Sequence, residues 1–232
     1  MTSDRLVLWD IDLTLVDLRG LGGRWYREAL ATVAGIDLRE MPAFPGRTEL
    51  AITTELLHAH DVEATEETVG RIWAELIRLS EGARDSLPEH GHALPGAATT
   101  LAKLADAGVV QSLVTGNLPE IALHKLAAFD LHRHLDFDIG GYGSLSAQRP
   151  DLVAHAMELA ERKHGRRFPA ESVVVVGDTP NDVAAALAHG AVAVGVATGK
   201  HTEAELAESG AHAVFRDLSE TGEVLPTLAG AL

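Results

Sequence analysis

The chain carries two carboxylates, Asp10 and Asp12, directly after a short apolar run. Residues 6–9 are continuously apolar, which is typical of a buried parallel strand. If the extended geometry continues, both carboxylates lie on the same side, and a pair about 4 Å apart repels by roughly 4 kcal/mol at an effective dielectric near 20. Solvent, a shared proton or a bound cation must relieve that repulsion. A turn in which Asp accepts local hydrogen bonds is the alternative, and residues 10–14 alone leave both interpretations open.

Polar residues follow two further apolar segments, 109–114 and 173–176. Because ligands of open parallel sheets bind outside the carboxyl ends of the strands, we expect these polar side chains to meet at one edge. They are Asp10, Asp12, Thr115, Asn117, Asp178 and Asp182. Four carboxylates with no basic residue adjacent to them in the sequence favour a hard-cation site, and oxygen ligands suit Mg²⁺. Helix capping could explain a single residue of this kind, and it becomes a much weaker explanation when the pattern recurs on three strands.

Apolar strands alternate with helical patterns along most of the chain. The expected strands are 6–9, 109–114, 137–139, 173–176, 191–196 and 213–215. The expected helices between them lie near 97–107, 119–128, 151–164, 181–189 and 202–209. Residues 140–143 are interpreted as a connection from strand to helix. This alternation predicts an α/β fold with a Rossmann-like parallel sheet and right-handed crossovers.

Residues 17–88 interrupt the alternation, because they contain no convincing strand. Loops between strand and helix usually run about 2–6 residues, so this interval must be a folded insertion. Apolar residues recur at helical spacing in three segments, 25–33, 50–58 and 68–79. We therefore predict a core formed by 1–16 and 89–232, with an all-helical cap at 17–88. Arg47, early in this cap, is a candidate substrate contact or a solvated arginine at a helix start.

Composition restricts the class of function. The 232 residues carry a formal net charge of −15, which disfavours binding to nucleic acid because phosphates would be repelled. No apolar stretch is long enough to span a membrane, and the first residues do not resemble a signal peptide. The absence of cysteine excludes disulfides and thiolate ligands and fits a cytoplasmic protein. We expect neither a nucleic-acid nor a membrane partner.

The motifs together resemble the haloacid dehalogenase superfamily of phosphotransferases. Residues 10–14 match its first motif, Thr115 its second and residues 177–182 its fourth, in the family's order across the chain. Arg149 stands where the third motif has a basic residue, usually lysine. The insertion at 17–88 is similar to the family's first cap type, as in relatives of phosphoglycolate phosphatase and β-phosphoglucomutase. Position 13, usually glycine, is Leu13, so the turn there is expected to differ slightly.

The resemblance implies a mechanism. Asp10 would attack phosphorus and form an aspartyl-phosphate, while Asp12 would act as general acid and then base. The implied Mg²⁺ ligands are Asp10, the backbone carbonyl of Asp12, and Asp178, with Asp182 orienting them. The implied phosphoryl-binding residues are Thr115, Asn117 and Arg149, the last as an electrostatic clamp. An acid at position 12 argues against dehalogenation, which the family performs without one.

The expected activity is Mg²⁺-dependent hydrolysis of a small-molecule phosphate monoester, either phosphoglycolate-like or a sugar phosphate. A phosphomutase of the β-phosphoglucomutase type is the enzymatic alternative. A phosphoacceptor signalling module or a silent binding protein is the non-enzymatic one. The residues do not decide between a monomer and a homodimer.

Overall fold

A parallel sheet forms the centre of the protein. The computed structural model describes residues 4–18, 20–38 and 44–230. Within these ranges, six strands pair in the order β5-β4-β1-β6-β7-β8, all parallel. Their bounds are β1 Leu6–Trp9, β4 Val110–Thr115, β5 Gly141–Tyr142, β6 Val173–Gly177, β7 Val192–Val196 and β8 Ala213–Phe215. Strand order reverses beside β1, as in doubly wound folds, so the predicted α/β fold is confirmed.

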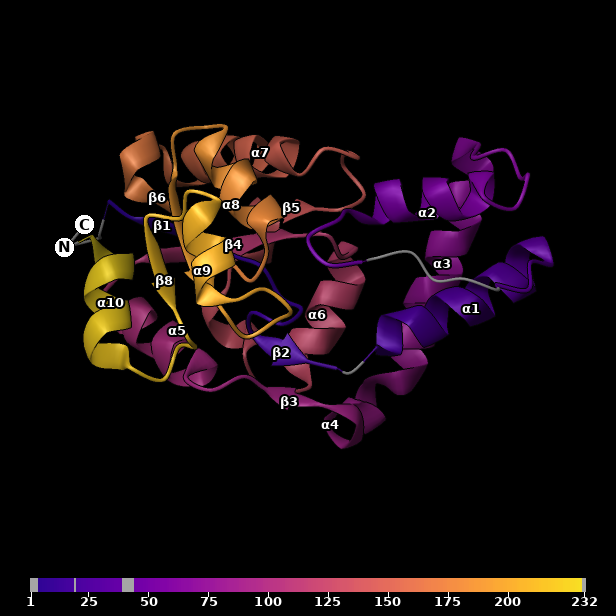
Figure 1. Cartoon of the computed structure of the whole chain (residues 1–232), viewed down its shortest axis with the longest axis horizontal. Helices are drawn as coiled ribbons and strands as arrows, with labels where there is room; N and C mark the ends of the chain where they lie inside the picture. Colours follow the sequence, from indigo (N-terminus) through magenta and orange to yellow (C-terminus); the bar gives the residue numbers. More distant parts are fainter. Residues whose placement is uncertain (1–3, 19, 39–43, 231–232) are drawn as a thin grey trace.

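Both faces of the sheet are covered by helices, which is why its strands are apolar throughout. Alternate residues of β1 enter two separate cores, Leu6 and Leu8 on one face and Val7 and Trp9 on the other. Helices α7 (Arg149–His164) and α8 (Pro180–Leu187) pack on the first face. Helices α5 (Ala97–Asp106) and α10 (Thr221–Ala229) cover the second (Figure 1).

The remaining core helices are α6 (Pro119–Ala127) and α9 (Glu203–Glu208). All five predicted core helices are therefore present, within a few residues of the expected bounds. Pro119 and Pro150 lie in the first turns of α6 and α7, where a missing N–H costs little. Helix α10 was not predicted.

The third predicted strand was wrong. Residues Phe137–Ile139 form a 3₁₀ turn, and the strand is Gly141–Tyr142, within the segment interpreted as a connection. The turn forms because the Asp136 side chain accepts a hydrogen bond from the Asp138 N–H at 3.1 Å. Gly141 suits the strand because a Cβ there would lie 2.1 Å from the Leu152 carbonyl oxygen of α7. Close backbone approach, rather than side-chain propensity, fixes β5.

A two-stranded antiparallel ribbon leads into and out of the insertion. It pairs β2 (Val16–Asp17) with β3 (His92–Ala93), and neither strand was predicted. Between them lie the inserted helices α1 (Leu21–Ala34), α2 (Glu49–His58), α3 (Glu66–Ala83) and α4 (Leu87–His90), with a 3₁₀ turn at Arg84–Ser86. Figure 1 shows α1, α2 and α3 grouped beside the sheet. The three predicted helical segments of the insertion are confirmed.

Among the described residues, no helix combines the length and the apolar character that crossing a membrane would require.

Candidate active site

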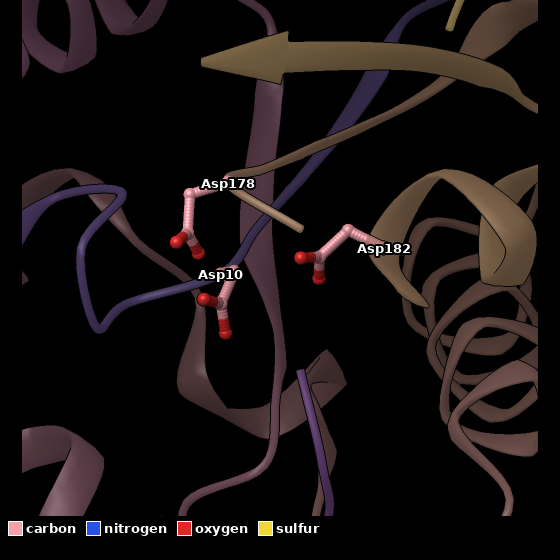
Figure 2. A group of neighbouring side chains, drawn as sticks. All are labelled: Asp10, Asp178 and Asp182. Carbon is pink, nitrogen blue, oxygen red and sulfur yellow. The ribbon is translucent and has the colours of Figure 1, made fainter. Parts of the chain in front are cut away.

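Three aspartates converge at the carboxyl edge of the sheet (Figure 2). Asp10 follows β1, Asp178 follows β6, and Asp182 lies in the first turn of α8. Each offers a carboxylate oxygen within 4.8 Å of the others, and all three are buried. The backbone N–H of Asp10 donates to the Val176 carbonyl at 2.9 Å, which holds Asp10 to the neighbouring strand beyond the end of β1.

Arg149 contacts two of these three aspartates, Asp10 and Asp182. This first residue of α7 is 6% exposed, and its Nη2 atom lies 2.8 Å from Asp10 Oδ1 and 2.6 Å from Asp182 Oδ1. Nη2 also donates to the Val114 carbonyl at 3.2 Å. Burial alone would lower the pKa of Arg149, but the Asp182 and Asp10 carboxylates raise it above its usual value. The guanidinium is therefore a fixed positive charge against the predicted nucleophile.

Asp12 is paired with a different basic side chain, that of Lys125. Lys125 of α6 places Nζ at 2.7 Å from Asp12 Oδ1 and 2.6 Å from Oδ2. The same Nζ donates to Asn117 Oδ1 at 2.7 Å, while Asn117 Nδ2 donates to Asp12 Oδ2 at 2.8 Å. Lys125 is buried, whereas the Asp12 side chain is 45% exposed. The repulsion expected between Asp10 and Asp12 is thus relieved partly by two separate basic side chains.

Sequence reasoning missed Lys125. It lies in the second turn of α6, ten positions beyond Thr115, and only the docking of α6 brings it to Asp12. Lys125 shares a helix face with the buried residues Ile121 and Ala122, so a lysine among apolar positions was the one signal that could have found it. Asn117, predicted to bind phosphate, here contacts Asp12 and also donates to Thr115 Oγ1 at 2.8 Å. Thr115 is fully buried at the end of β4.

The Asp182 side chain caps helix α8 and also contacts Arg149. Its N–H donates to Thr179 Oγ1 at 3.3 Å, and its Oδ2 accepts from the Thr179 N–H at 3.1 Å and hydroxyl at 2.6 Å. This reciprocal capping fixes the start of α8. The other oxygen of Asp182, Oδ1, faces Arg149. Asp182 therefore caps α8 with one oxygen and contacts Arg149 with the other, and its orienting role stays a prediction.

The carboxylates are compatible with a divalent cation. Burial raises the pKa of Asp10 to about 7, with Arg149 lowering it and Asp182 and Asp12 raising it further. Burial, followed by Asp10 and Asp182, raises the pKa of Asp178 to about 9. Asp178 Oδ2 is buried and finds no hydrogen-bond partner among the described residues. A bound cation would favour the ionised form of both carboxylates, which is the form that ligates Mg²⁺.

Leu13 follows Asp12 in a left-handed backbone conformation. Its φ is +60°, in the region that favours glycine, and a difference from the family's turn stays a prediction. Its N–H donates to the Val16 carbonyl at 2.8 Å, and the Thr198 hydroxyl donates to its carbonyl. These contacts hold a conformation that costs about 1–2 kcal/mol for a residue with a Cβ.

A cavity of about 830 Å³ lies over these residues, between the sheet edge and the inserted helices. Its core wall includes Asp10, Asp12, Lys125, Arg149 and Asp178. The insertion contributes residues from the start of α1 and from the segment leading into α2. Arg47, the predicted substrate contact, lines the cavity and forms an ion pair with Glu55. A volume of this size suits a small molecule.

The fold and the aspartates at the strand ends define a class of parallel α/β proteins with an acidic site at the sheet edge, and comparison with known proteins identifies the family. A family model described as haloacid dehalogenase-like hydrolase matches residues 7–187. The chain belongs to this family, and it is therefore a hydrolase.

Individual relatives support the fold. A hydrolase structure from Pseudomonas syringae is 24% identical with a TM-score of 0.68, covering 97% of this chain and 98% of that one. The structure of a predicted phosphoglycolate phosphatase from Haemophilus somnus is 19% identical with a TM-score of 0.64, covering 97% and 99%. A protein named as the pyrophosphatase PpaX, from Caldanaerobacter subterraneus subsp. tengcongensis, is 31% identical over 97 residues. That match spans 41% of this chain and 41% of the relative.

Proposed function

We propose that the protein is a Mg²⁺-dependent phosphatase that hydrolyses a small-molecule phosphate monoester through a phosphorylated Asp10. One observation carries this proposal. Asp10 and Asp12 line the same cavity, yet each is paired with its own buried cation, Arg149 for Asp10 and Lys125 for Asp12. Two carboxylates in different environments can take different roles, which a nucleophile and a general acid require.

Asp10 is suited to attack because it is held at two points. Its N–H is bonded to β6, and its Oδ1 is bonded to Arg149. In the first step a carboxylate oxygen of Asp10 would bond to phosphorus as the ester oxygen leaves. Arg149 would stabilise the negative charge that the phosphoryl oxygens carry during transfer.

Asp12 is suited to move protons because it is more exposed than Asp10 and is oriented by Lys125 and Asn117. It would give a proton to the departing ester oxygen in the first step. In the second step it would accept a proton from the water that attacks phosphorus. The bond between phosphorus and Asp10 then breaks, which regenerates the Asp10 carboxylate and releases inorganic phosphate.

Asp10, Asp178 and the backbone carbonyl of Asp12 would hold the Mg²⁺. The unpartnered Oδ2 of Asp178 is the observation that favours this set. When bound, the cation would neutralise charge that otherwise keeps a phosphate away from an acidic site. Asp182 would act through Arg149, which it contacts at 2.6 Å.

The inserted helices would act as a cap over the site. The N–H groups of Glu49 and Leu50 donate to the Gly116 and Gly143 carbonyls, both at 2.9 Å, so the start of α2 is tied to loops at the sheet edge. A site covered in this way favours a small phosphate over a phosphoprotein.

The test is a panel of phosphate monoesters assayed for phosphate release with and without Mg²⁺, for the wild type and for Asp10→Asn. We expect release that requires Mg²⁺ and is abolished by Asp10→Asn. No Mg²⁺-dependent release from any ester would overturn the phosphatase proposal. Activity that survives in Asp10→Asn would overturn the assignment of the nucleophile.

A further inference from the structure

Glu49, the first residue of α2, is a carboxylate in the cavity wall that the proposed mechanism does not use. The Tyr26 hydroxyl donates a hydrogen bond to its Oε2. The Tyr26 and Thr53 hydroxyl oxygens lie 2.8 Å apart, and Trp73 Nε1 donates to Thr53 Oγ1 at 3.0 Å. Because the single Tyr26 proton goes to Glu49, Thr53 donates to Tyr26 and accepts from Trp73, so the bonds run in one direction and end at Glu49 as the acceptor. None of the described residues donates to its second oxygen, Oε1.

The backbone of Glu49 is fixed to the phosphoryl-binding edge. Its N–H donates to the Gly116 carbonyl at 2.9 Å, and Gly116 lies between Thr115 and Asn117. A Cβ at Gly116 would lie 1.9 Å from the Arg47 carbonyl oxygen, so glycine is needed for this close approach. Glu49 is therefore held both through its side chain and through its backbone, as a preorganised binding group would be.

Glu49 faces the side of the site where the leaving group departs. Burial raises the pKa of Glu49 to about 7, Tyr26 and Lys125 lower it, and Asp12 raises it again. The geometry places Glu49 near both charges, because its N–H bonds the Gly116 carbonyl and the adjacent Asn117 is bonded to both Asp12 and Lys125. Since Asp12 is the residue that would protonate the ester oxygen, a group beside Asp12 lies next to the leaving group rather than next to the phosphoryl oxygens.

The basic residues of the insertion are less suited to bind a second anion there. Arg24 and Arg27 line the cavity but are exposed, and Arg47 is paired with Glu55. A leaving group with its own carboxylate would bring a second negative charge toward Glu49 and Asp12. Hydroxyl groups would instead find a fixed acceptor in Glu49.

We propose that Glu49 binds a hydroxyl group of the leaving group, so that the substrate is the phosphate monoester of a polyol or sugar rather than of a hydroxy acid. This inference rests on the phosphatase function proposed above. A hydroxyl bound at Glu49 replaces the water that would otherwise solvate its free oxygen. Such a site rejects an analogue that cannot donate, because Oε1 of Glu49 would then be left without a donor.

The experiment compares two esters of similar size, glycerol 3-phosphate and 2-phosphoglycolate, in the Mg²⁺-loaded protein. The measured quantity is the ratio of their kcat/KM values, in which any loss of folded enzyme cancels. We expect the wild type to favour glycerol 3-phosphate by about tenfold or more, and Glu49→Ala to lower the ratio by about tenfold or more. Glu49→Gln, which keeps a carbonyl acceptor but no negative charge, should give an intermediate ratio.

The matched control is Glu28→Ala, which removes an exposed carboxylate from α1 and should leave the ratio within about twofold of the wild type. A wild type that prefers 2-phosphoglycolate, or a ratio that Glu49→Ala leaves unchanged, would overturn this inference while leaving the phosphatase function intact. Failure of the phosphatase function itself would look different, because neither ester nor any other in the panel would release phosphate.

Discussion

Replacing Lys125 by Met tests whether Asp12 works as an oriented acid. The substitution keeps most of the apolar volume and removes three hydrogen bonds, two to Asp12 and one to Asn117, at 2.6–2.7 Å. Hydrogen bonds to charged groups contribute about 1.5–3 kcal/mol in mutational series. Because the Asp12 side chain is 45% exposed, water replaces part of this, and we expect unfolding free energy to fall by only about 1–2 kcal/mol.

The kinetic effect should be larger and should depend on the leaving group. Acid catalysis contributes about 10²–10⁴-fold, and Asn117 still holds one oxygen of Asp12, so we expect about 10–100-fold loss on an alkyl phosphate. A nitrophenolate leaves without needing a proton. Because kcat/KM reports the first step and not the hydrolysis step that both esters share, the ratio of kcat/KM on glycerol 3-phosphate to kcat/KM on 4-nitrophenyl phosphate should fall by nearly the whole of that factor.

Lys163→Met is the matched control, because Lys163 also bonds two carboxylates, Asp136 and Asp138, both at 2.7 Å, but on the surface. This variant should leave the ratio unchanged. Steady-state assays with both esters, together with thermal unfolding, give the required data. An equal loss of kcat/KM on the two esters in Lys125→Met would refute an orienting role for Lys125 in the acid step and indicate a general structural one.

Three further outcomes are expected. Arg149→Lys should retain phosphate release within about tenfold of the wild type and Arg149→Met should lose about 100-fold or more, since a single charge is the essential element; equal losses would contradict this. In metal-free protein, stability measured by denaturant titration should fall as the pH rises from about 4 toward the raised pKa values of Asp10, about 7, and Asp178, about 9. Between these pH values the folded state holds the protons and the unfolded state does not. Mg²⁺ should therefore stabilise the protein more at pH 8 than at pH 5, and a stability that does not change with pH would count against the buried cluster. Leu13→Gly should change unfolding free energy by less than about 1 kcal/mol, because relief of the left-handed φ offsets lost packing and added chain entropy.

The sequence predicts the aspartates of the site well because their positions follow from the ends of strands. Asp10 and Asp178 come directly after continuous apolar runs, so the carboxyl edge of a parallel sheet brings them together whatever the details of packing. Arg149 was also predicted, although only through the resemblance. Its bonds to both Asp10 and Asp182 depend on how α7 docks against the sheet.

The residues that sequence reasoning missed lie on helices or in short strands. Lys125 and Glu49 reach the site only because α6 and α2 dock at particular angles, and neither stands at a recognisable position in a motif. Strand β5 has two residues and is fixed by the close approach of Gly141 to α7, which leaves no apolar alternation to detect. The β2 and β3 ribbon is equally short.

The central claim is that Asp10 carries the phosphoryl group during turnover. The direct measurement is peptide mapping by mass spectrometry after acid quenching of the Mg²⁺-loaded enzyme during hydrolysis of a substrate from the panel. The account predicts a phosphoryl group on Asp10, present during turnover, lost when the substrate is exhausted and absent from Asp10→Asn. A phosphoryl group on any other residue, or phosphate release with Asp10 unmodified at every quench time, would contradict it.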